Sequence, residues 1–287
     1  MLVAGAGNSL ILFVIFWNKS IRKVKANWLL AQLSLANLVL GVAAGTRGIS
    51  NIFFGYFGIQ NFDRWICLVL GSPNVFGIHL SRVSIAAIAS DRFLCIKYPF
   101  FYRKQETTKF PILRFLVCLG YSLLGTFGAY LGVPFDSSYK VSVCSTGAVI
   151  TVWYSNYWFF FASVFTLLSY VAYIGIYVLF KRQFSNSFGK SGFQKTIFGT
   201  TTAVLVSDFV LWCIPNILSA LFKVTRVPPT FDAYVSIMIG FCAHLTSVTD
   251  IFIYGWKHRQ LRDSMKKLVV KESTTFVSPV PGYVVSF

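Results

Sequence analysis

Several charged residues stand inside or at the ends of long apolar stretches of the sequence. Arg82 lies in the third stretch and Asp91 just beyond its end, Asp208 lies in the sixth and Asp250 in the seventh. A charge at the centre of a bilayer is costly, so such residues normally pair, bind water or bind an ion, and they indicate functional sites. The sequence contains no metal-ligand cluster, nucleophile elbow or phosphate-binding loop, so we expect no enzyme and no cofactor.

The composition indicates that these residues are surrounded by lipid. Of the 287 residues, 55% are hydrophobic and only 12% are charged, about half the charged share of a typical soluble domain. The formal net charge is +17, but the basic residues fall between apolar runs and do not gather on one amphipathic domain. We therefore expect a bilayer, and not nucleic acid, as the partner of this chain.

Seven apolar runs predict an all-α bundle of seven membrane-spanning helices. The runs are 2–17, 27–45, 66–89, 110–133, 149–180, 197–222 and 231–254. The first run would span about 24 Å, less than the hydrocarbon core of about 30 Å. Either this helix lies in a thinned bilayer or the native chain carries an N-terminal extension, and we expect the extension.

A short amphipathic helix is predicted after the seventh run, over residues 256–268. Trp256, Leu261, Met265 and Leu268 recur at near-helical spacing between basic residues, which is typical of a helix on an anionic membrane surface. The alternative is a solvated basic tail. Residues 1–268 would form one membrane domain, and 269–287 a short disordered tail.

The distribution of basic residues predicts the orientation. Of the 26 Lys and Arg residues, 20 follow the first, third, fifth and seventh runs. Cytoplasmic segments carry such an excess, so the N-terminus would lie outside and the C-terminus in the cytosol.

Motifs in five of the runs resemble those of rhodopsin-like (class A) G-protein-coupled receptors. The third run places Cys67 25 residues before Arg92 of the triplet Asp91-Arg92-Phe93. The others, in family order, are Gly7-Asn8, Leu33-Ser34-Leu35-Ala36-Asn37-Leu38, Trp212-Cys213-Ile214-Pro215 and Asp250-Ile251-Phe252-Ile253-Tyr254. The chain is identified as a divergent orphan or chemosensory member of that family.

The resemblance implies a receptor in the plasma membrane that passes a signal from an extracellular ligand to a heterotrimeric G protein. Arrestin and a receptor kinase would be further partners, at the tail. It assigns the G-protein switch to Asp91, Arg92, Phe93 and Tyr254, and the helix-six switch to Phe209, Trp212, Cys213 and Pro215. It also implies a disulfide between Cys67 and Cys144, which would both face the oxidising exterior.

Two departures from the family concern buried charge. Asn37 and Asp250 exchange the residue types that the family has there, and leave one carboxylate in a polar site with Asn8, Ser81 and Ser247. This site would hold water or sodium; in the alternative, Asp250 only pairs with a neighbouring helix. Arg82 and Asp208 stand where the family packs apolar side chains, and we expect them to form a buried ion pair.

A third departure lies at the cytosolic side. Lys195 stands twenty residues before Pro215, where the family often has an acid that restrains the switch arginine. No acid occurs from Lys181 to Ser207. Asp91 is then the remaining partner of Arg92, and we expect raised basal activity.

The ligand is the least determined feature. Asn74 replaces the aspartate of amine receptors, and His244 stands where opsins carry their retinal lysine. The expected pocket residues are polar and aromatic: Asn74, His79, Tyr157, Trp158, Asn216, Tyr234 and His244. Such a lining suits a small organic molecule or the end of a peptide.

Two other functions stay open at this point. The chain could be a receptor-like membrane protein whose altered motifs no longer signal. It could also be a small transporter or channel, although no internal repeat relates its halves, as many transporter folds require.

Overall fold

The computed structural model describes residues 2–23, 26–98, 100, 102, 109–134, 140–141, 144–185, 199, 202–204, 206–225, 229–257 and 261–265. These residues are mostly helical. Five helical segments are long and apolar enough to cross a membrane: 27–56, 64–97, 110–128, 152–179 and 202–219. Two shorter apolar helical segments cover 2–17 and 238–253. The described chain is therefore a multi-pass helical membrane protein.

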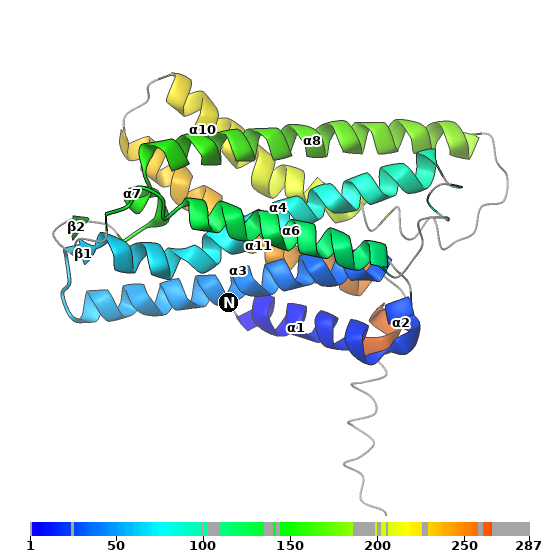
Figure 1. Ribbon diagram of the computed structural model, residues 1–287, viewed down its shortest axis with the longest axis horizontal. Coiled ribbons are helices and arrows are strands. Elements are labelled where there is room, and N and C mark those ends of the chain that lie inside the picture. Colours follow the sequence, from blue (N-terminus) through cyan, green and yellow to red (C-terminus); the bar gives the residue numbers. More distant parts are fainter. Residues whose placement is uncertain are drawn as a thin grey trace, which may run out of the picture.

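Helix α4 (Arg64–Lys97) is the centre of the bundle. It packs against α3 (Ala26–Tyr56), α6 (Lys109–Gly128) and α8 (Val152–Ser185), which run alongside it (Figure 1). A buried hydrogen bond from Gln32 Nε2 to Ser84 Oγ, 2.9 Å long, joins α3 to α4.

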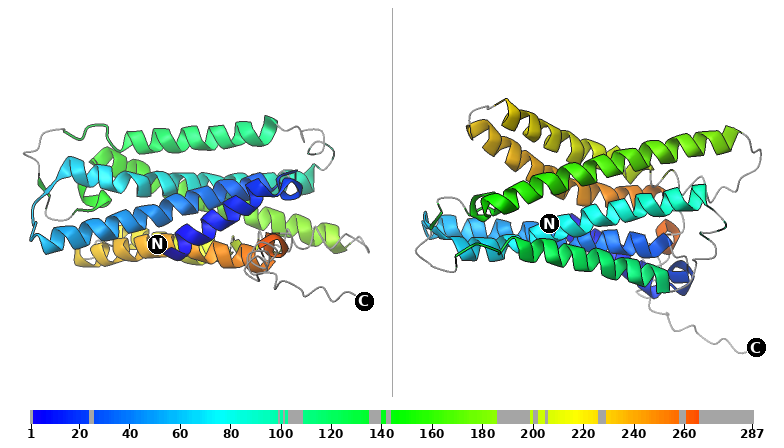
Figure 2. Two further views of the ribbon diagram at one scale, coloured as in Figure 1. Left: turned by 90° about the horizontal axis from the view of Figure 1, so that it is seen from below. Right: turned by 45° about the horizontal axis from the view of Figure 1, so that its top comes forward.

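The remaining long helices complete the bundle. Helix α1 (Leu2–Trp17) packs against α3 and against α11 (Pro229–Lys257), and the short α2 (Lys19–Lys23) follows it. Views from two further sides show the long helices running in roughly the same direction (Figure 2). We call the end with the bonded Cys67 and Cys144 the disulfide end, and the opposite end of α4 the Arg92 end.

Helix α3 continues eleven residues past the predicted end at Gly45. It ends at Tyr56, and Gly58, two residues later, has a φ of 62°. There the Gly58 N–H donates to Gly55 O and the Ile59 N–H donates to Phe54 O. This pair of hydrogen bonds is a Schellman motif, which satisfies the last carbonyls of the helix.

The disulfide end is covered by short elements. Strands β1 (Phe62–Asp63) and β2 (Lys140–Val141) form an antiparallel pair, a small addition to the predicted all-α fold, and α7 (Thr146–Val149) follows. Asp63 also begins α4, because its carboxylate accepts hydrogen bonds from the N–H groups of Trp65 and Ile66, as an N-cap residue does.

Several helix boundaries differ from those predicted. Helix α4 runs to Lys97 and not to Ala89, and α6 stops at Gly128, before the turn at Gly132 with its φ of 79°. Helix α8 begins at Val152, because residues 146–149 belong to α7. Helix α11 extends past both predicted ends of the run 231–254.

The sixth predicted helix is interrupted. Residues 202–204 and 206–208 are helical, η1 (Phe209–Cys213) is a π-helical turn, and α10 (Ile214–Val224) follows. In the π turn the Ile214 N–H donates to Phe209 O, five residues back. Pro215 has no N–H to offer the preceding turn, and such positions are common causes of a local break in the helical ladder.

The predicted amphipathic segment 256–268 is described in part. Residues 261–265 are helical, and Leu261 is fully buried in a cluster with Ile11, Val14 and Ile15. Asn18 Nδ2 donates to Ser264 Oγ at 3.2 Å. These residues therefore pack on α1 and the segment that follows it; the tail 269–287 lies outside the described residues.

Candidate functional site

The disulfide end is closed by one covalent bond and one arginine. Cys67 of α4 is bonded to Cys144, with their Cα atoms 5.2 Å apart. Arg64 Nε donates to Val149 O at 2.7 Å. Together they hold the segment around α7 across the start of α4.

Three of the predicted ligand residues lie together between α4 and α8. His79 is fully buried, and its ring stacks on Tyr157 and meets Trp158 edge-on, with centroid distances of 5.9 and 5.2 Å. Its Nδ1 lies 2.9 Å from Val75 O and its Nε2 3.2 Å from Tyr157 Oη. Both ring nitrogens of His79 therefore already have protein partners.

A glycine makes this close packing possible. A Cβ added to Gly125 of α6 would lie 2.6 Å from His79 Nε2 and 3.2 Å from Tyr157 Oη. Any side chain there would push the histidine or the tyrosine aside, so Gly125 keeps the three helices in contact.

The other predicted ligand residues are spread over three helices, α4, α10 and α11. Asn74 Oδ1 on α4 and His244 Nδ1 on α11 are buried atoms that have no hydrogen-bond partner among the residues that the structure describes. Asn216 on α10 donates its amide to Trp212 O of the preceding π turn at 2.7 Å. The Tyr234 side chain lies outside the described residues.

A buried charge cluster joins α4 to the π turn. Arg82 Nη1 contacts Asp208 Oδ1, and both side chains are almost fully buried. The Arg82 guanidinium carbon also lies 4.1 Å from the centre of the Trp212 ring, which is within range of a cation–π interaction. Arg82 is thus joined, within the apolar core, to two neighbouring residues of the sixth helical region that are far from it in the sequence.

The predicted helix-six switch residues divide between core and surface. Trp212, Cys213 and Pro215 are buried, whereas Phe209 is 37% exposed. The Phe209 ring meets Tyr170 of α8 edge-on, with a centroid distance of 4.9 Å.

The predicted intramembrane polar site brings α1, α3 and α11 together. Asn37 Nδ2 donates to Asp250 Oδ2 at 2.8 Å, and Asn8 Nδ2 donates to Ala4 O at 2.8 Å and to Ser247 O at 3.4 Å. The side chains of Asn8, Asn37, Ser247 and Asp250 are essentially buried. Ser81 is also buried, on α4.

Several oxygen atoms of this site can still accept a hydrogen bond or bind a cation. Asn8 Oδ1, Asn37 Oδ1, Ser247 Oγ and Asp250 Oδ1 are buried and have no hydrogen-bond partner among the described residues. Such oxygen donors suit a hard cation or ordered water. No group of three or more His, Cys, Asp or Glu side chains suited to a metal occurs in the described part of the chain.

At the Arg92 end, Asp91 is the centre of the contacts. Arg114 Nη1 of α6 donates to Asp91 Oδ1 at 2.7 Å, and Tyr102 Oη lies 3.2 Å from both carboxylate oxygens. Burial and the nearby Asp91 charge raise the pKa of Tyr102 above its usual value. Tyr102 thus remains protonated and can donate to Asp91.

Arg92 itself is held more loosely. Its Nη1 lies 3.9 Å from Asp91 Oδ2, and its Nε is buried with no hydrogen-bond partner in the described part of the chain. The centre of the Phe93 ring lies 5.3 Å from Lys97 Nζ. The Tyr254 side chain and Lys195 lie outside the described residues.

Comparison with known proteins decides the family. The family model of the serpentine type 7TM GPCR chemoreceptor Srsx matches residues 1–269. This chain belongs to the Srsx family. The resemblance to rhodopsin-like receptors is thereby confirmed at the level of the family.

Individual relatives of this Srsx chain are receptors of modest identity. Adenosine receptor A3 of Ovis aries is 24% identical over 92% of this chain and 84% of the relative. Adenosine receptor A2b of Gallus gallus is 25% identical over 93% and 84%. Neuropeptide FF receptor 2 of Rattus norvegicus is 25% identical over only 52% of this chain and 34% of its own length.

The places of three residues of this Srsx chain in the fold were not predicted from the sequence. Arg114 and Tyr102 contact Asp91 from outside α4, and no local pattern in the sequence signals those contacts. Arg47 lies in the part of α3 that continues past its predicted end, where the Schellman ending at Gly58 is the signal that could have revealed it.

Proposed function

We propose that this chain spans the plasma membrane seven times and converts the binding of an extracellular ligand into activation of a heterotrimeric G protein. In this proposal the disulfide end faces the exterior and the Arg92 end the cytosol, in agreement with the excess of basic residues near the Arg92 end. The two shorter apolar helices, α1 and the apolar part of α11, would complete the set of seven spans.

The observation that carries the proposal is the arrangement at the Arg92 end. Asp91 is engaged by Arg114 at 2.7 Å, and the Arg92 guanidinium is 3.9 Å from it. An arginine with so little restraint can turn toward a bound G protein at small cost. Tyr254 would take part in the same switch.

The relatives narrow the ligand only to two broad chemical classes. The names of the relatives indicate adenosine for some and neuropeptides for others, so a small molecule or a peptide is proposed here. The entry route would be the disulfide end. Arrestin and a receptor kinase are proposed as further partners at the tail.

The polar site around Asp250 is proposed to hold sodium with water. The support is the set of four buried oxygen atoms without partners, one of which belongs to a carboxylate. Such a cation would offset the buried charge of Asp250.

The direct test is nucleotide exchange on purified G proteins, with the full chain in lipid nanodiscs. We expect exchange above the rate of empty nanodiscs, and its loss in Arg92→Ala. Lys19→Ala is the matched control, since Lys19 is an exposed cation on α2 and should leave the rate unchanged.

Two results would favour the other functions. Exchange that equals the empty-disc rate with every G-protein class would indicate a receptor-like protein that does not signal. Flux of ions or solutes through liposomes that carry the protein would indicate a transporter or channel.

A further inference from the structure

We propose that the Arg82–Asp208 ion pair selects the register of the sixth helical region, residues 202–204 and 206–224. In the register described here, the π turn brings Asp208 to Arg82. In a second register, a regular α-helical turn would bring Phe209 to the same place. The ion pair is thus a latch between two states of one helix, and this latch is a property that the receptor function proposed above does not require.

The π turn is the reason that Asp208 lies opposite Arg82. The Ile214 N–H donates to Phe209 O, five residues back, whereas an α-helix joins residues that are four apart. The turn therefore contains one residue more than an α turn, and each residue before it is displaced by one place relative to a regular helix counted back from Pro215. In that regular helix the place opposite Arg82 would belong to the next residue, Phe209.

Arg82 contacts the region on both sides of this extra residue. Its Nη1 contacts Asp208 Oδ1 before the turn, and its guanidinium carbon lies 4.1 Å from the centre of the Trp212 ring near the end of the turn. Arg82 and Asp208 are both nearly buried, so separation of the two charges is costly. A change to the regular helix would leave Trp212 near Arg82 and take Asp208 away, and the ion pair therefore opposes that change.

Phe209 is the side chain that can replace Asp208 at this place. In the present register Phe209 is 37% exposed and meets Tyr170 of α8 edge-on, with a centroid distance of 4.9 Å. In the second register its ring would face the Arg82 guanidinium, as the Trp212 ring does now, and would gain packing contacts inside the bundle. Both registers therefore have favourable contacts of their own.

Pro215 reduces the preference of the backbone for one register over the other. It has no N–H, so an α ladder leaves Leu211 O without its donor and a π ladder leaves Val210 O without its donor. Each register thus lacks one backbone hydrogen bond at this proline. The Asn216 side-chain amide supplies a donor beside it, to Trp212 O at 2.7 Å. Side chains, and above all the buried ion pair, then decide the register.

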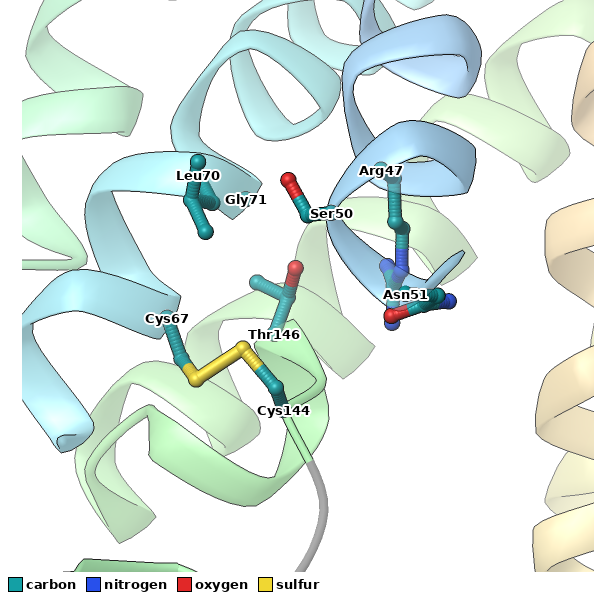
Figure 3. Close-up of a pocket in the computed structure, with 8 residues that line it drawn as sticks. All are labelled: Arg47, Ser50, Asn51, Cys67, Leu70, Gly71, Cys144 and Thr146. Atoms are coloured by element: carbon teal, nitrogen blue, oxygen red, sulfur yellow. A yellow bond between two sulfur atoms is a disulfide. The ribbon is translucent and has the colours of Figure 1, made fainter. Parts of the chain in front are cut away.

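The disulfide end gives a fixed reference for an experiment. The disulfide joins Cys67 of α4 to Cys144, and a Cβ on Gly71 would lie only 2.6 Å from Thr146 Oγ1. The recess beside the disulfide, between α3, α4 and the segment around α7, has room for only about one water molecule (Figure 3). Asn51 of α3 is an exposed residue at this closely packed end.

The experiment measures distances between pairs of nitroxide labels by pulsed electron paramagnetic resonance, on the full chain in lipid nanodiscs. Unnatural amino acids carry the labels, so the native cysteines stay in place. One label replaces Val206, which is exposed before the turn, and its partners replace the exposed Lys19 of α2 or Tyr177 of α8. A separate pair, Asn51 with the exposed Ile217 of α10, reports on the part of the region beyond the turn.

We expect one main distance for each labelled pair in the unaltered chain. Arg82→Leu with Asp208→Leu removes the ion pair, leaves no buried charge and offers Phe209 an apolar neighbour. A displacement by one helical place would move the Val206 label by about 8 Å around the helix, so at least one of its two distances should change by several ångströms. The distance between Asn51 and Ile217 should stay the same.

Two further variants keep the test decisive. Gln32→Leu with Ser84→Ala removes a buried hydrogen bond between α3 and α4 that involves no residue of the sixth helical region, and all distances should stay unchanged in it. Arg82→Met with Asp208→Leu serves if the first double variant does not fold, because a methionine adapts to irregular apolar space.

Three results would overturn the proposal. Unchanged Val206 distances in a folded double variant would show that the ion pair does not set the register. A change in the Ile217 distance as large as that at Val206 would show a general loosening of the bundle, and so would the same change in the Gln32 and Ser84 variant. No G protein is present, so the outcome is independent of the receptor function.

Discussion

Asp91 is bound more closely by Arg114 than by its sequence neighbour Arg92. The nitrogen–oxygen distances are 2.7 Å and 3.9 Å. The Asp91 carboxylate is nearly buried, so its contact with Arg114 is shielded from water and salt. Arg114 thus competes with Arg92 for the carboxylate that would otherwise restrain it.

Removal of this competitor should lower ligand-independent signalling. In Arg114→Ala the carboxylate has only Arg92 and Tyr102 as partners, and the Asp91–Arg92 contact should tighten. A shift of about 1.4 kcal/mol would reduce basal nucleotide exchange roughly tenfold. The measurement is basal exchange at equal surface density, with Lys19→Ala as control. A basal rate that rises in Arg114→Ala would show that Arg114 is itself part of the restraint.

Lys195→Glu should also lower basal signalling. The family pattern predicts that this position faces Arg92, so an acid there would attract Arg92 and a lysine would repel it. At an effective dielectric constant near 20 the interaction is a few kcal/mol at most, and salt weakens it. Basal exchange should therefore fall about tenfold or less, and the fall should shrink at high ionic strength. Lys195→Gln is the matched control, and an unchanged rate in Lys195→Glu would contradict the proposed role.

The Arg82–Asp208 pair predicts a characteristic pattern of stability. Arg82→Leu or Asp208→Leu alone should destabilise the protein by about 3–5 kcal/mol, because the remaining charge is buried without its partner. The double variant should recover much of this loss. Thermal unfolding in detergent measures the effect. If the double variant unfolds at the temperature of the worse single variant, the two charges do not depend on each other.

The disulfide should behave as one unit. Cys67→Ser, Cys144→Ser and the double variant should lose the same amount of stability, about 2–4 kcal/mol, because a bond lost from either side is lost once. Surface expression and thermal unfolding are the measurements. Additive losses in the double variant would show that the two cysteines act separately.

Sodium should stabilise the protein through Asp250. Replacement of choline chloride by sodium chloride should raise the melting temperature. At a sodium concentration of roughly ten times the dissociation constant, the bound ion would add about 1.4 kcal/mol to the free energy of unfolding. Asp250→Asn removes the carboxylate and should abolish the difference between the two salts. An equal sodium effect in the variant would place the ion elsewhere.

The sequence predicts those features that depend on spacing along one helix. Cys67 and Arg92 lie 25 residues apart, so they stand at opposite ends of a spanning helix whatever surrounds it. Buried charge is predictable as well, since Arg82 and Asp208 stand in apolar runs and a bilayer penalises either residue alone.

Features that depend on packing between helices escape such reasoning. Nothing near Arg114 in the sequence indicates Asp91, 23 residues away on another helix. The end of α3 is predicted wrongly for a local reason. Polar residues after Gly45 suggest a loop, whereas the helix continues to Tyr56 and is ended by the left-handed Gly58. Arg47 therefore falls outside the predicted helix, and the recess beside the disulfide cannot be predicted from the apolar runs.

The π turn at Phe209–Cys213 has a consequence for how this chain is compared with its relatives. A π turn holds one residue more than an α turn, so every side chain beyond it is rotated by about 100° relative to an uninterrupted helix. A relative with a regular helix here would need one residue fewer to present the same faces on both sides. A chain shortened by Val210 would therefore restore a regular helix, while Asp208 and Pro215 keep the faces that they present here.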